Sequence, residues 1–224
     1  MYCSERMNIY TPIHSESEPL RAVSVFALHA DAVREMDWEP VRRRLPGRIE
    51  MANRYRFERD KLLCIGAGLL LLKAVGIRDE TELRYGEYGR PFAPGYPDFN
   101  LSHSGEWCVL AVGEKQIGAD IERVDSANLH VAPMVYTAAE LAWMEESPLE
   151  RFHVLWTLKE SVMKATGQGM NLGPESFEVL PFCFGASVAL RGCIWHASHG
   201  ALGEYRYSVC ASYPMKVDLV QVAP

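Results

Sequence analysis

A period of two in the apolar positions runs through the middle of the chain and predicts two neighbouring strands. Residues 107–112 form an apolar segment of strand length, residues 113–116 have the composition of a turn, and residues 117–122 alternate between two faces. Because so short a turn joins them, we expect the two strands to pair as a β-hairpin.

The second of these strands carries its charged residues on one face. Successive side chains of a strand alternate, so its apolar residues point to one side, and the carboxylates of Asp120 and Glu122 share the other side with Gly118. Two carboxylates this close repel each other unless both are solvated or a cation lies between them, and oxygen ligands of this kind suit a hard ion such as Mg²⁺. The spacing alone is compatible with a solvated strand face and with a cation site.

The chain before this region predicts one strand and a set of helices. Pro46-Gly47 divides a polar, helix-compatible segment in two, and Gly76 ends an almost wholly apolar helix. The predicted elements are a strand at 22–28, two helices within 37–59, a core helix at 60–75 and a Gly- and Pro-rich loop at 85–97.

The chain after this region predicts two helices and then strands. Thr137 and Glu140 have the spacing of a capping box, which opens a short helix through Met144, and the glycines of 167–169 end a longer helix. The predicted elements are these two helices, the longer one at 149–166, and strands at 187–191, 205–211 and 217–222.

The long helix has an apolar face and a second, partly polar stripe. The residues expected to be buried are Phe152, Leu155, Leu158, Val162 and Ala165. Trp156, Glu160 and Lys164 recur at four-residue steps along a different face. A Glu160–Lys164 pair on an exposed helix would contribute only about 0.2–0.5 kcal/mol, so a surface salt bridge is its plainest interpretation.

A polar turn precedes the two central strands. In Leu101-Ser102-His103-Ser104-Gly105 a histidine lies between two serines, inside an otherwise apolar region. Such a histidine can be purely structural. Its small neighbours, however, leave backbone N–H groups open to an anion such as phosphate.

Composition limits the class of protein. The chain has 224 residues, 48% of them hydrophobic and 23% charged, as in soluble globular proteins of one large or two small domains. The first residues contain no apolar run of signal-peptide type, and the longest apolar stretch, 64–72, is too short to span a bilayer, so we expect a cytoplasmic protein. Six dispersed cysteines, which we expect to be reduced thiols, are Cys3, Cys64, Cys108, Cys183, Cys193 and Cys210.

Charge is distributed unevenly along the chain. The net charge of −6 argues against general nucleic-acid binding. Residues 42–61 nevertheless contain eight basic and three acidic side chains, a local excess of positive charge. This cluster is either a solvated helix surface or a site for an anionic ligand.

Four sequence blocks, taken together, resemble the 4′-phosphopantetheinyl transferase superfamily in its long, single-chain form, typified by the surfactin-synthetase-activating enzymes. They occur in the family's order and at its spacing, and they are Tyr88-Gly89-Arg90-Pro91, the segment 99–105 with its Ser-His-Ser, Ile117-Gly118-Ala119-Asp120-Ile121-Glu122, and the segment 152–170 with its Trp-Thr-Leu-Lys-Glu-Ser. Each block alone is a weak signal, whereas the four together are specific.

The resemblance implies a fold and an activity. The fold is α+β, with two similar halves, 1–112 and 113–224, related by a pseudo-two-fold axis around a cleft that binds coenzyme A. The activity transfers the 4′-phosphopantetheine arm of coenzyme A to a serine of an apo acyl or peptidyl carrier protein and releases adenosine 3′,5′-bisphosphate. The implied protein is a monomer that binds neither nucleic acid nor membrane.

The resemblance also implies roles for the polar residues. Asp120, Glu122 and Glu160 would hold Mg²⁺, for which Mn²⁺ could substitute. Glu160 would also be the base for the carrier serine, and Lys164 would neutralise or protonate the departing phosphate.

Further residues match positions that contact coenzyme A in the family. Ser102, His103 and Lys164 would contact its phosphates, and Arg90 would lie near the adenylate phosphate. Arg48 and Lys61 fall in the basic segment where the family has additional phosphate contacts, although one expected basic position falls on or near Cys64.

Two other functions could use the same residues. A metal-dependent hydrolase of coenzyme A or nucleotides could use the carboxylates, and it would form products without a carrier protein. A non-catalytic relative would only bind coenzyme A or a carrier; such a protein would be expected to lack one of the site groups, and none of Asp120, Glu122, Glu160 and Lys164 is missing.

Overall fold

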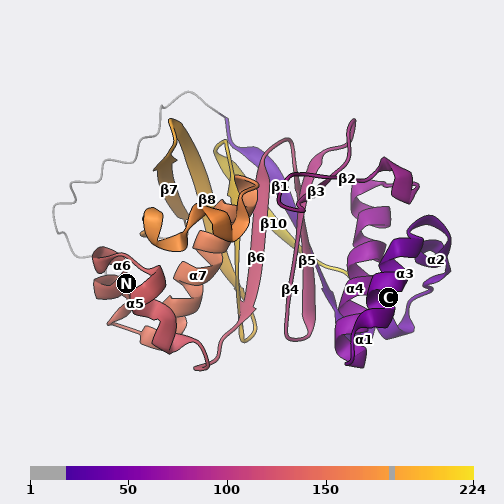
Figure 1. Cartoon of the computed structure of the whole chain (residues 1–224), viewed down its shortest axis with the longest axis horizontal. Helices are drawn as coiled ribbons and strands as arrows, with labels where there is room; N and C mark the ends of the chain where they lie inside the picture. The colour runs from indigo at the N-terminus through magenta and orange to yellow at the C-terminus, as the bar shows by residue number, and fades with distance from the viewer. Residues whose placement is uncertain (1–18, 182–184) are drawn as a thin grey trace.

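Two four-stranded sheets lie at the centre of the molecule, and helices pack at either end (Figure 1). The structure, a computed structural model, describes residues 19–181 and 185–224. The first sheet has the order β10 (Met215–Gln221), β1 (Arg21–His29), β5 (Trp107–Gly113), β4 (Asp98–Ser104). The second has the order β6 (Ile117–Arg123), β9 (Tyr205–Ala211), β8 (Cys193–Leu202), β7 (Gly185–Leu190). Separate sheets and helices confirm the α+β class.

The expected hairpin between β5 and β6 is wrong. β5 is hydrogen-bonded along one edge to β1 and along the other to β4, so it has no free edge for a third strand. The chain turns after Gly113 and enters β6, which instead pairs antiparallel with β9 in the second sheet. The alternation within β6 was read correctly, since its apolar residues are buried in a cluster with those of β1, β5 and β9 that joins the two sheets.

The first sheet draws its strands from both ends of the described chain. β10 pairs with β1 in parallel, from Arg21 opposite Met215 to Ala27 opposite Gln221, and the other strand pairs in the two large sheets are antiparallel. A strand from the second predicted half is therefore part of the first sheet. The division at 112/113 and the pseudo-two-fold axis stay predictions.

Helices cover the outer face of the first sheet. They are α1 (Ala30–Glu35), α2 (Glu39–Arg44), α3 (Pro46–Arg54) and α4 (Glu58–Leu70), which continues as a π-helical turn, η1 (Leu71–Val75). Pro46 begins α3, which confirms the predicted division of the polar segment. Gly76 adopts φ +86° and ends the apolar helix as expected. The Gly- and Pro-rich segment is not entirely loop, because β2 (Arg84–Tyr85) and β3 (Pro91–Phe92) pair within it; η2 (Glu80–Glu82) precedes them.

A long helix, α7 (Pro148–Ala165), packs against the second sheet. The helices and helical turns near it are η3 (Leu129–Val131), α5 (Ala132–Val135), α6 (Ala138–Met144), η4 (Gly169–Leu172) and η5 (Pro174–Ser176). The capping box predicted for α6 is confirmed. Gly118 on β6 lies directly under α7, since a Cβ at this position would overlap the carbonyl oxygen of Ser161. This close contact places one side of α7 beside the carboxylates of β6.

Four of the six cysteines lie within the described residues, and all four are free thiols. Cys64, Cys108 and Cys210 are buried free thiols and Cys193 is an exposed one, whereas Cys3 and Cys183 lie outside the described residues. In residues 19–181 and 185–224, no helix combines the length and apolar character needed to cross a membrane.

Candidate functional site

The edges of the two sheets meet where β4 faces β6, and we call this boundary the seam. Side chains of β4 bridge it by accepting backbone N–H groups of β6: Asp98 from Ile117 at 2.8 Å, Asn100 from Ala119 at 2.9 Å, and Ser104 from Arg123 at 3.1 Å. Every second residue of β4 points toward β6 because side chains alternate along a strand. Polar side chains thus take the place of a backbone ladder.

Two tyrosines, Tyr205 at the start of β9 and Tyr213 just after its end, reach the turns at both ends of β5. The hydroxyl of Tyr205 accepts the backbone N–H of Glu106 at 3.0 Å, and that of Tyr213 accepts the N–H of Glu114 at 2.9 Å. Each ring lies against a glycine, at 105 and 113, where a side chain would collide with it. Both tyrosines are buried, so the two sheets are fixed to each other at both ends of β5.

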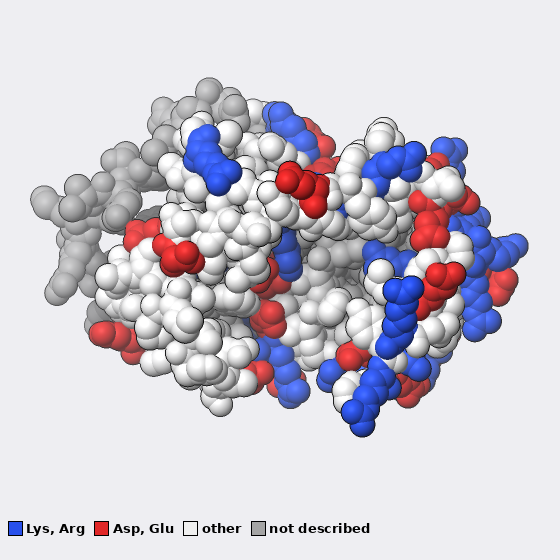
Figure 2. All heavy atoms as spheres, in the orientation of Figure 1, with Lys and Arg blue, Asp and Glu red and all other residues white. Residues whose placement is uncertain are grey.

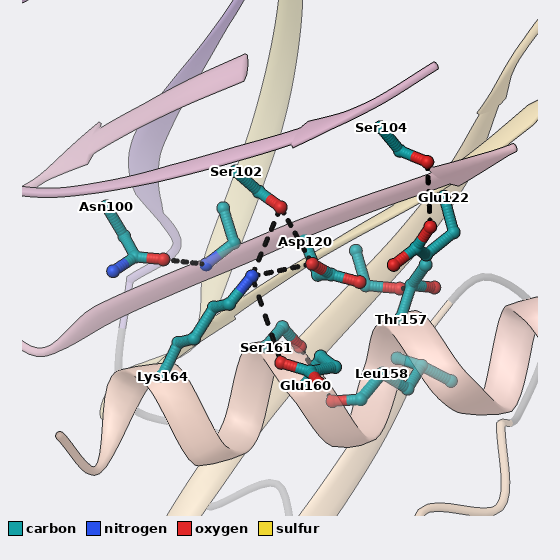
Figure 3. A network of polar contacts seen from close by, with 12 residues as sticks. Asn100, Ser102, Ser104, Asp120, Glu122, Thr157, Leu158, Glu160, Ser161 and Lys164 are labelled. Atoms are coloured by element: carbon teal, nitrogen blue, oxygen red, sulfur yellow. Dashed lines mark hydrogen bonds and ion pairs between the residues drawn. The ribbon is translucent and has the colours of Figure 1, made fainter. Parts of the chain in front are cut away.

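The seam opens into a cavity of about 240 Å³ beside α7. Seven residues line it: Leu101, Ser102, His103, Asp120, Glu122, Glu160 and Lys164. They come from β4, β6 and α7, which are distant in sequence. Figure 3 shows the polar ends of Ser102, Asp120 and Glu160 turned toward Lys164. Six of the nine residues selected from the sequence therefore lie in one place.

Lys164 is the centre of the hydrogen-bond network. Its Nζ lies 2.6 Å from Oδ1 of Asp120, 3.1 Å from Oγ of Ser102 and 3.8 Å from Oε2 of Glu160 (Figure 3). Ser102 also donates to Oδ1 of Asp120 at 2.8 Å. Since the lysine side chain is only 26% exposed and its shortest contact is with β6, the Glu160–Lys164 pair is not an isolated surface salt bridge.

The acidic residues of the cavity have perturbed pKa values. Burial, followed by the charge of Asp120, raises the pKa of Glu122 to about 7. The same two causes raise the pKa of Glu160. Burial opposes the positive charge of Lys164, but the carboxylates of Asp120 and Glu160 outweigh it and raise the pKa of the lysine. The cavity therefore holds three carboxyl groups, of Asp120, Glu122 and Glu160, around the single ammonium group of Lys164.

The donor set fits a hard cation. Oδ2 of Asp120 is buried and has no hydrogen-bond partner, which marks an unused oxygen at the cavity. The raised pKa values of Glu122 and Glu160 show that further positive charge would be favourable there. Within the described ranges, no three His, Cys, Asp or Glu side chains already stand in metal-holding geometry, so the carboxylates would have to move closer together around an ion.

His103 lies at the mouth of the cavity. Loss of solvent around its ring, together with the positive charge of Lys164, lowers its pKa, so the imidazole is neutral at pH 7. The charges of Arg48 on α3 and Asp60 on α4 also act on it. Arg48 is therefore near the cavity without lining it.

The other two predicted basic residues lie apart from this cavity lining. Lys61 is half-buried on the first turns of α4. Arg90 donates through one terminal nitrogen to Asp98 at 2.7 Å and to the carbonyl of Ile117 at 2.8 Å, so it ties the end of β3 to the seam.

Figure 2 shows that Lys and Arg side chains gather over the end of the molecule formed by α1–α4. Part of this charge is compensated locally, because Arg43 lies 3.8 Å from Glu39 and Arg34 lies 3.6 Å from Glu58. The basic segment is thus both a solvated helix surface and a source of positive charge near His103.

Sequence reasoning missed a buried ion pair behind the site. Nζ of Lys159 lies 2.9 Å from Oε1 of Glu140, and it also donates to the carbonyls of Pro174 and Phe177. The signal was available, because Lys159 interrupts the apolar stripe of α7 between Leu155 and Val162. Ser104 was also given no role, although it contacts Glu122 at 2.7 Å.

The chain is similar to known proteins over a region that contains Asp120, Glu122, Glu160 and Lys164 of this site. Residues 116–210 match the model of the 4′-phosphopantetheinyl transferase superfamily. A 4′-phosphopantetheinyl transferase of Bacillus subtilis is 34% identical over 163 residues, which cover 67% of this chain and 72% of that protein. The 4′-phosphopantetheinyl transferase Sfp of Bacillus subtilis strain 168 is 32% identical over 148 residues, 61% of this chain and 66% of that protein. The 4′-phosphopantetheinyl transferase gsp of Aneurinibacillus migulanus is 38% identical over 112 residues, 48% of this chain and 47% of that protein.

Proposed function

The chain belongs to the 4′-phosphopantetheinyl transferase superfamily, and we propose that it transfers the 4′-phosphopantetheine arm of coenzyme A to a serine of an apo acyl or peptidyl carrier protein. The released product is adenosine 3′,5′-bisphosphate. One observation carries the proposal: Asp120, Glu122, Glu160 and Lys164 line a single cavity together with Ser102 and His103.

The reaction sets two demands on such a site. The serine oxygen forms a bond to a phosphorus of the diphosphate, and the bond from that phosphorus to the bridging oxygen breaks, leaving its electron pair on the bisphosphate. The site must therefore accept the serine proton and compensate negative charge on both phosphates.

Glu160 is the group that accepts the proton from the carrier serine. Its carboxylate is 19% exposed at the cavity wall, and burial beside Asp120 raises its pKa toward the range in which a carboxylate is an effective base. Its position on α7 is set by the packing of that helix over Gly118.

Lys164 compensates charge on the departing phosphate. Its raised pKa keeps it an ammonium at neutral pH, one helical turn from Glu160. Ser102 and His103 contact the diphosphate from the opposite wall, His103 as a neutral imidazole whose N–H still donates a hydrogen bond.

Asp120, Glu122 and Glu160 would hold Mg²⁺, with Mn²⁺ as a substitute. A divalent cation held there would neutralise diphosphate oxygens and polarise the phosphorus. The unpaired Oδ2 of Asp120 and the raised pKa values of the two glutamates support this assignment.

The basic residues outside the cavity complete the proposal. Arg48 and Lys61 would contact the remaining phosphates of coenzyme A, and the charge of Arg48 already reaches His103. Since one terminal nitrogen of Arg90 is bonded to Asp98, a phosphate contact by Arg90 would use Nη1. We also propose a cytoplasmic monomer of two pseudo-symmetric halves, 1–112 and 113–224, as the family resemblance implies; both halves contribute residues to the cavity.

Intact-protein mass spectrometry tests the proposal. An apo carrier domain is incubated with the protein, coenzyme A and Mg²⁺, and a parallel reaction contains EDTA. We expect a gain of one phosphopantetheine mass that EDTA abolishes. Consumption of coenzyme A without carrier modification would favour the hydrolase, and coenzyme A bound without any turnover on several carriers would favour a binding protein.

A further inference from the structure

The hydroxyl of Ser104 joins two neighbouring residues of β6 across the seam. It donates to Oε2 of Glu122 at 2.7 Å (Figure 3). It also accepts the backbone N–H of Arg123 at 3.1 Å. Ser104 is the last residue of β4, and its partner in the first sheet is Trp107. The serine therefore stands on a short hairpin whose turn is itself held by Tyr205.

The two bonds fix the direction of the hydroxyl. A serine oxygen has one proton to donate and two lone pairs that accept. The N–H of Arg123 occupies a lone pair, so the proton of Ser104 is free to point at Glu122. The backbone of β6, which carries Glu122, thus orients the Ser104 hydroxyl that hydrogen-bonds the Glu122 carboxylate.

The orientation of the Glu122 carboxylate depends on its single hydrogen bond to Ser104 more than that of Asp120 depends on either of its two side-chain contacts. Asp120 is bonded to both Lys164 and Ser102, whereas Ser104 is the side chain that hydrogen-bonds Glu122 in the part of the chain that the structure describes. Repulsion from Asp120 would otherwise favour rotation of the half-buried Glu122 toward solvent. Oε1 of Glu122 takes no part in the bond and stays available at the cavity.

We propose that Ser104 is a positioning residue that aims Glu122 at the cation site of the cavity. The inference rests on the proposed function, because that function gives Glu122 its role as a metal ligand. Residues that orient metal ligands typically contribute about 10- to 100-fold to metal affinity. Ser104 acts in this way through one oxygen, without contacting an ion itself.

The test measures Mn²⁺ affinity by electron paramagnetic resonance, on the full chain without coenzyme A or carrier. The variants are Ser104→Ala, Ser104→Cys and Ser104→Thr, with Ser176→Ala as the matched control. Ser176 also uses its hydroxyl in hydrogen bonds, to the carbonyls of Leu172 and Gly173, but it is not among the residues that line the cavity. Thermal unfolding of each variant confirms that it is folded.

Ser104→Ala should bind Mn²⁺ about tenfold more weakly than the unaltered chain. Ser104→Cys, which keeps the shape but donates weakly, should show a similar loss and replaces the alanine variant if that one does not fold. Ser104→Thr should restore affinity, and Ser176→Ala should leave it unchanged. Unchanged affinity in folded Ser104→Ala or Ser104→Cys would overturn the inference.

Carrier modification by the same proteins separates this inference from the proposed function. If the unaltered chain modifies carriers but its Mn²⁺ affinity is insensitive to Ser104, the function stands and the positioning role is wrong. If the Mn²⁺ affinity of the Ser104 variants falls as expected but the unaltered chain modifies no carrier, the positioning role stands and the transferase assignment is wrong.

Discussion

Lys159 and Glu140 form an ion pair in which neither side chain is exposed to solvent. The lysine sits on α7 directly before Glu160, and the glutamate also holds the start of α6 by accepting the N–H of Thr137. The carbonyls of Pro174 and Phe177 accept further hydrogen bonds from the ammonium group. The pair therefore joins α6, α7 and the segment after α7 behind the cavity.

Removing one member of this pair should destabilise the protein strongly. Lys159→Met leaves Glu140 buried without its counter-charge, and we expect a loss of about 3–5 kcal/mol in the free energy of unfolding. The double variant Lys159→Met, Glu140→Gln should lose less than Lys159→Met alone, because no unpaired charge remains. Urea denaturation measures these two variants and the single variant Glu140→Gln. A double variant as unstable as the sum of its single changes would show that the two residues act independently.

Gly118→Ala should displace α7 from β6. A Cβ at 118 has no space against the carbonyl of Ser161, so we expect a loss of about 1–3 kcal/mol, the usual range for overpacking. Gly86→Ala is the matched control, since a Cβ there meets its nearest atom at 3.7 Å. Thermal unfolding of both variants checks this. Equal midpoints would mean that α7 can shift without cost.

Glu160→Gln should abolish transfer while leaving the fold intact. The amide keeps the size of the side chain but cannot take the serine proton, so we expect kcat to fall by at least about 100-fold. Coenzyme A binding, measured by calorimetry, should be retained. Activity near that of the unaltered chain would remove Glu160 from the role of base.

Stability of the metal-free protein should fall as pH rises through the range set by Glu122. The pKa of Glu122 is about 7 in the folded protein, against an ordinary value of 4.5, because the side chain is buried and Asp120 is near. Between these values the folded form keeps a proton that the unfolded form has released. The stabilisation is thus complete below pH 4.5 and is lost as pH rises through 7, and it is on the order of 2 kcal/mol.

Glu122→Gln isolates this contribution. The variant cannot titrate at 122, so its unfolding free energy in EDTA, measured by urea denaturation, should change less between pH 5 and pH 7.5 than that of the unaltered chain. Parallel pH profiles for the two proteins would show that Glu122 is ionised at its ordinary pKa.

Much of the fold follows from local periodicity. The strand at 22–28, the capping box at Thr137 and the long helix at 149–166 were predicted close to their observed bounds. The hairpin error arose because pairing depends on which edges are free, and β5 had both edges occupied by strands far away in sequence. Strand β8 was not predicted, because its half-exposed His, Ser and Gly residues hide the alternation around Trp195 and Ala197.

The site followed from sequence only in part. Alternation in β6 placed Asp120 and Glu122 on one face, and four-residue steps in α7 placed Glu160 and Lys164 on another. The family resemblance assigned all four to one site, and the structure does bring them together. The role of Ser104 could not be derived in this way, because it depends on β4 lying opposite β6 across the seam. Arg90 illustrates the converse: its motif indicated a ligand contact, yet its nearest partner is Asp98.

The parallel pair of β1 and β10 has a consequence for the order of folding. Residues 21–27 pair with residues 215–221, which are synthesised much later. The edge of β1 that binds β10 therefore stays unpaired until nearly the whole described chain has left the ribosome. Ser102 and His103 stand on this same first sheet. β10 joins this sheet at the edge opposite β4, so the sheet that carries Ser102 and His103 starts near the beginning of the described chain and is completed by one of its last segments.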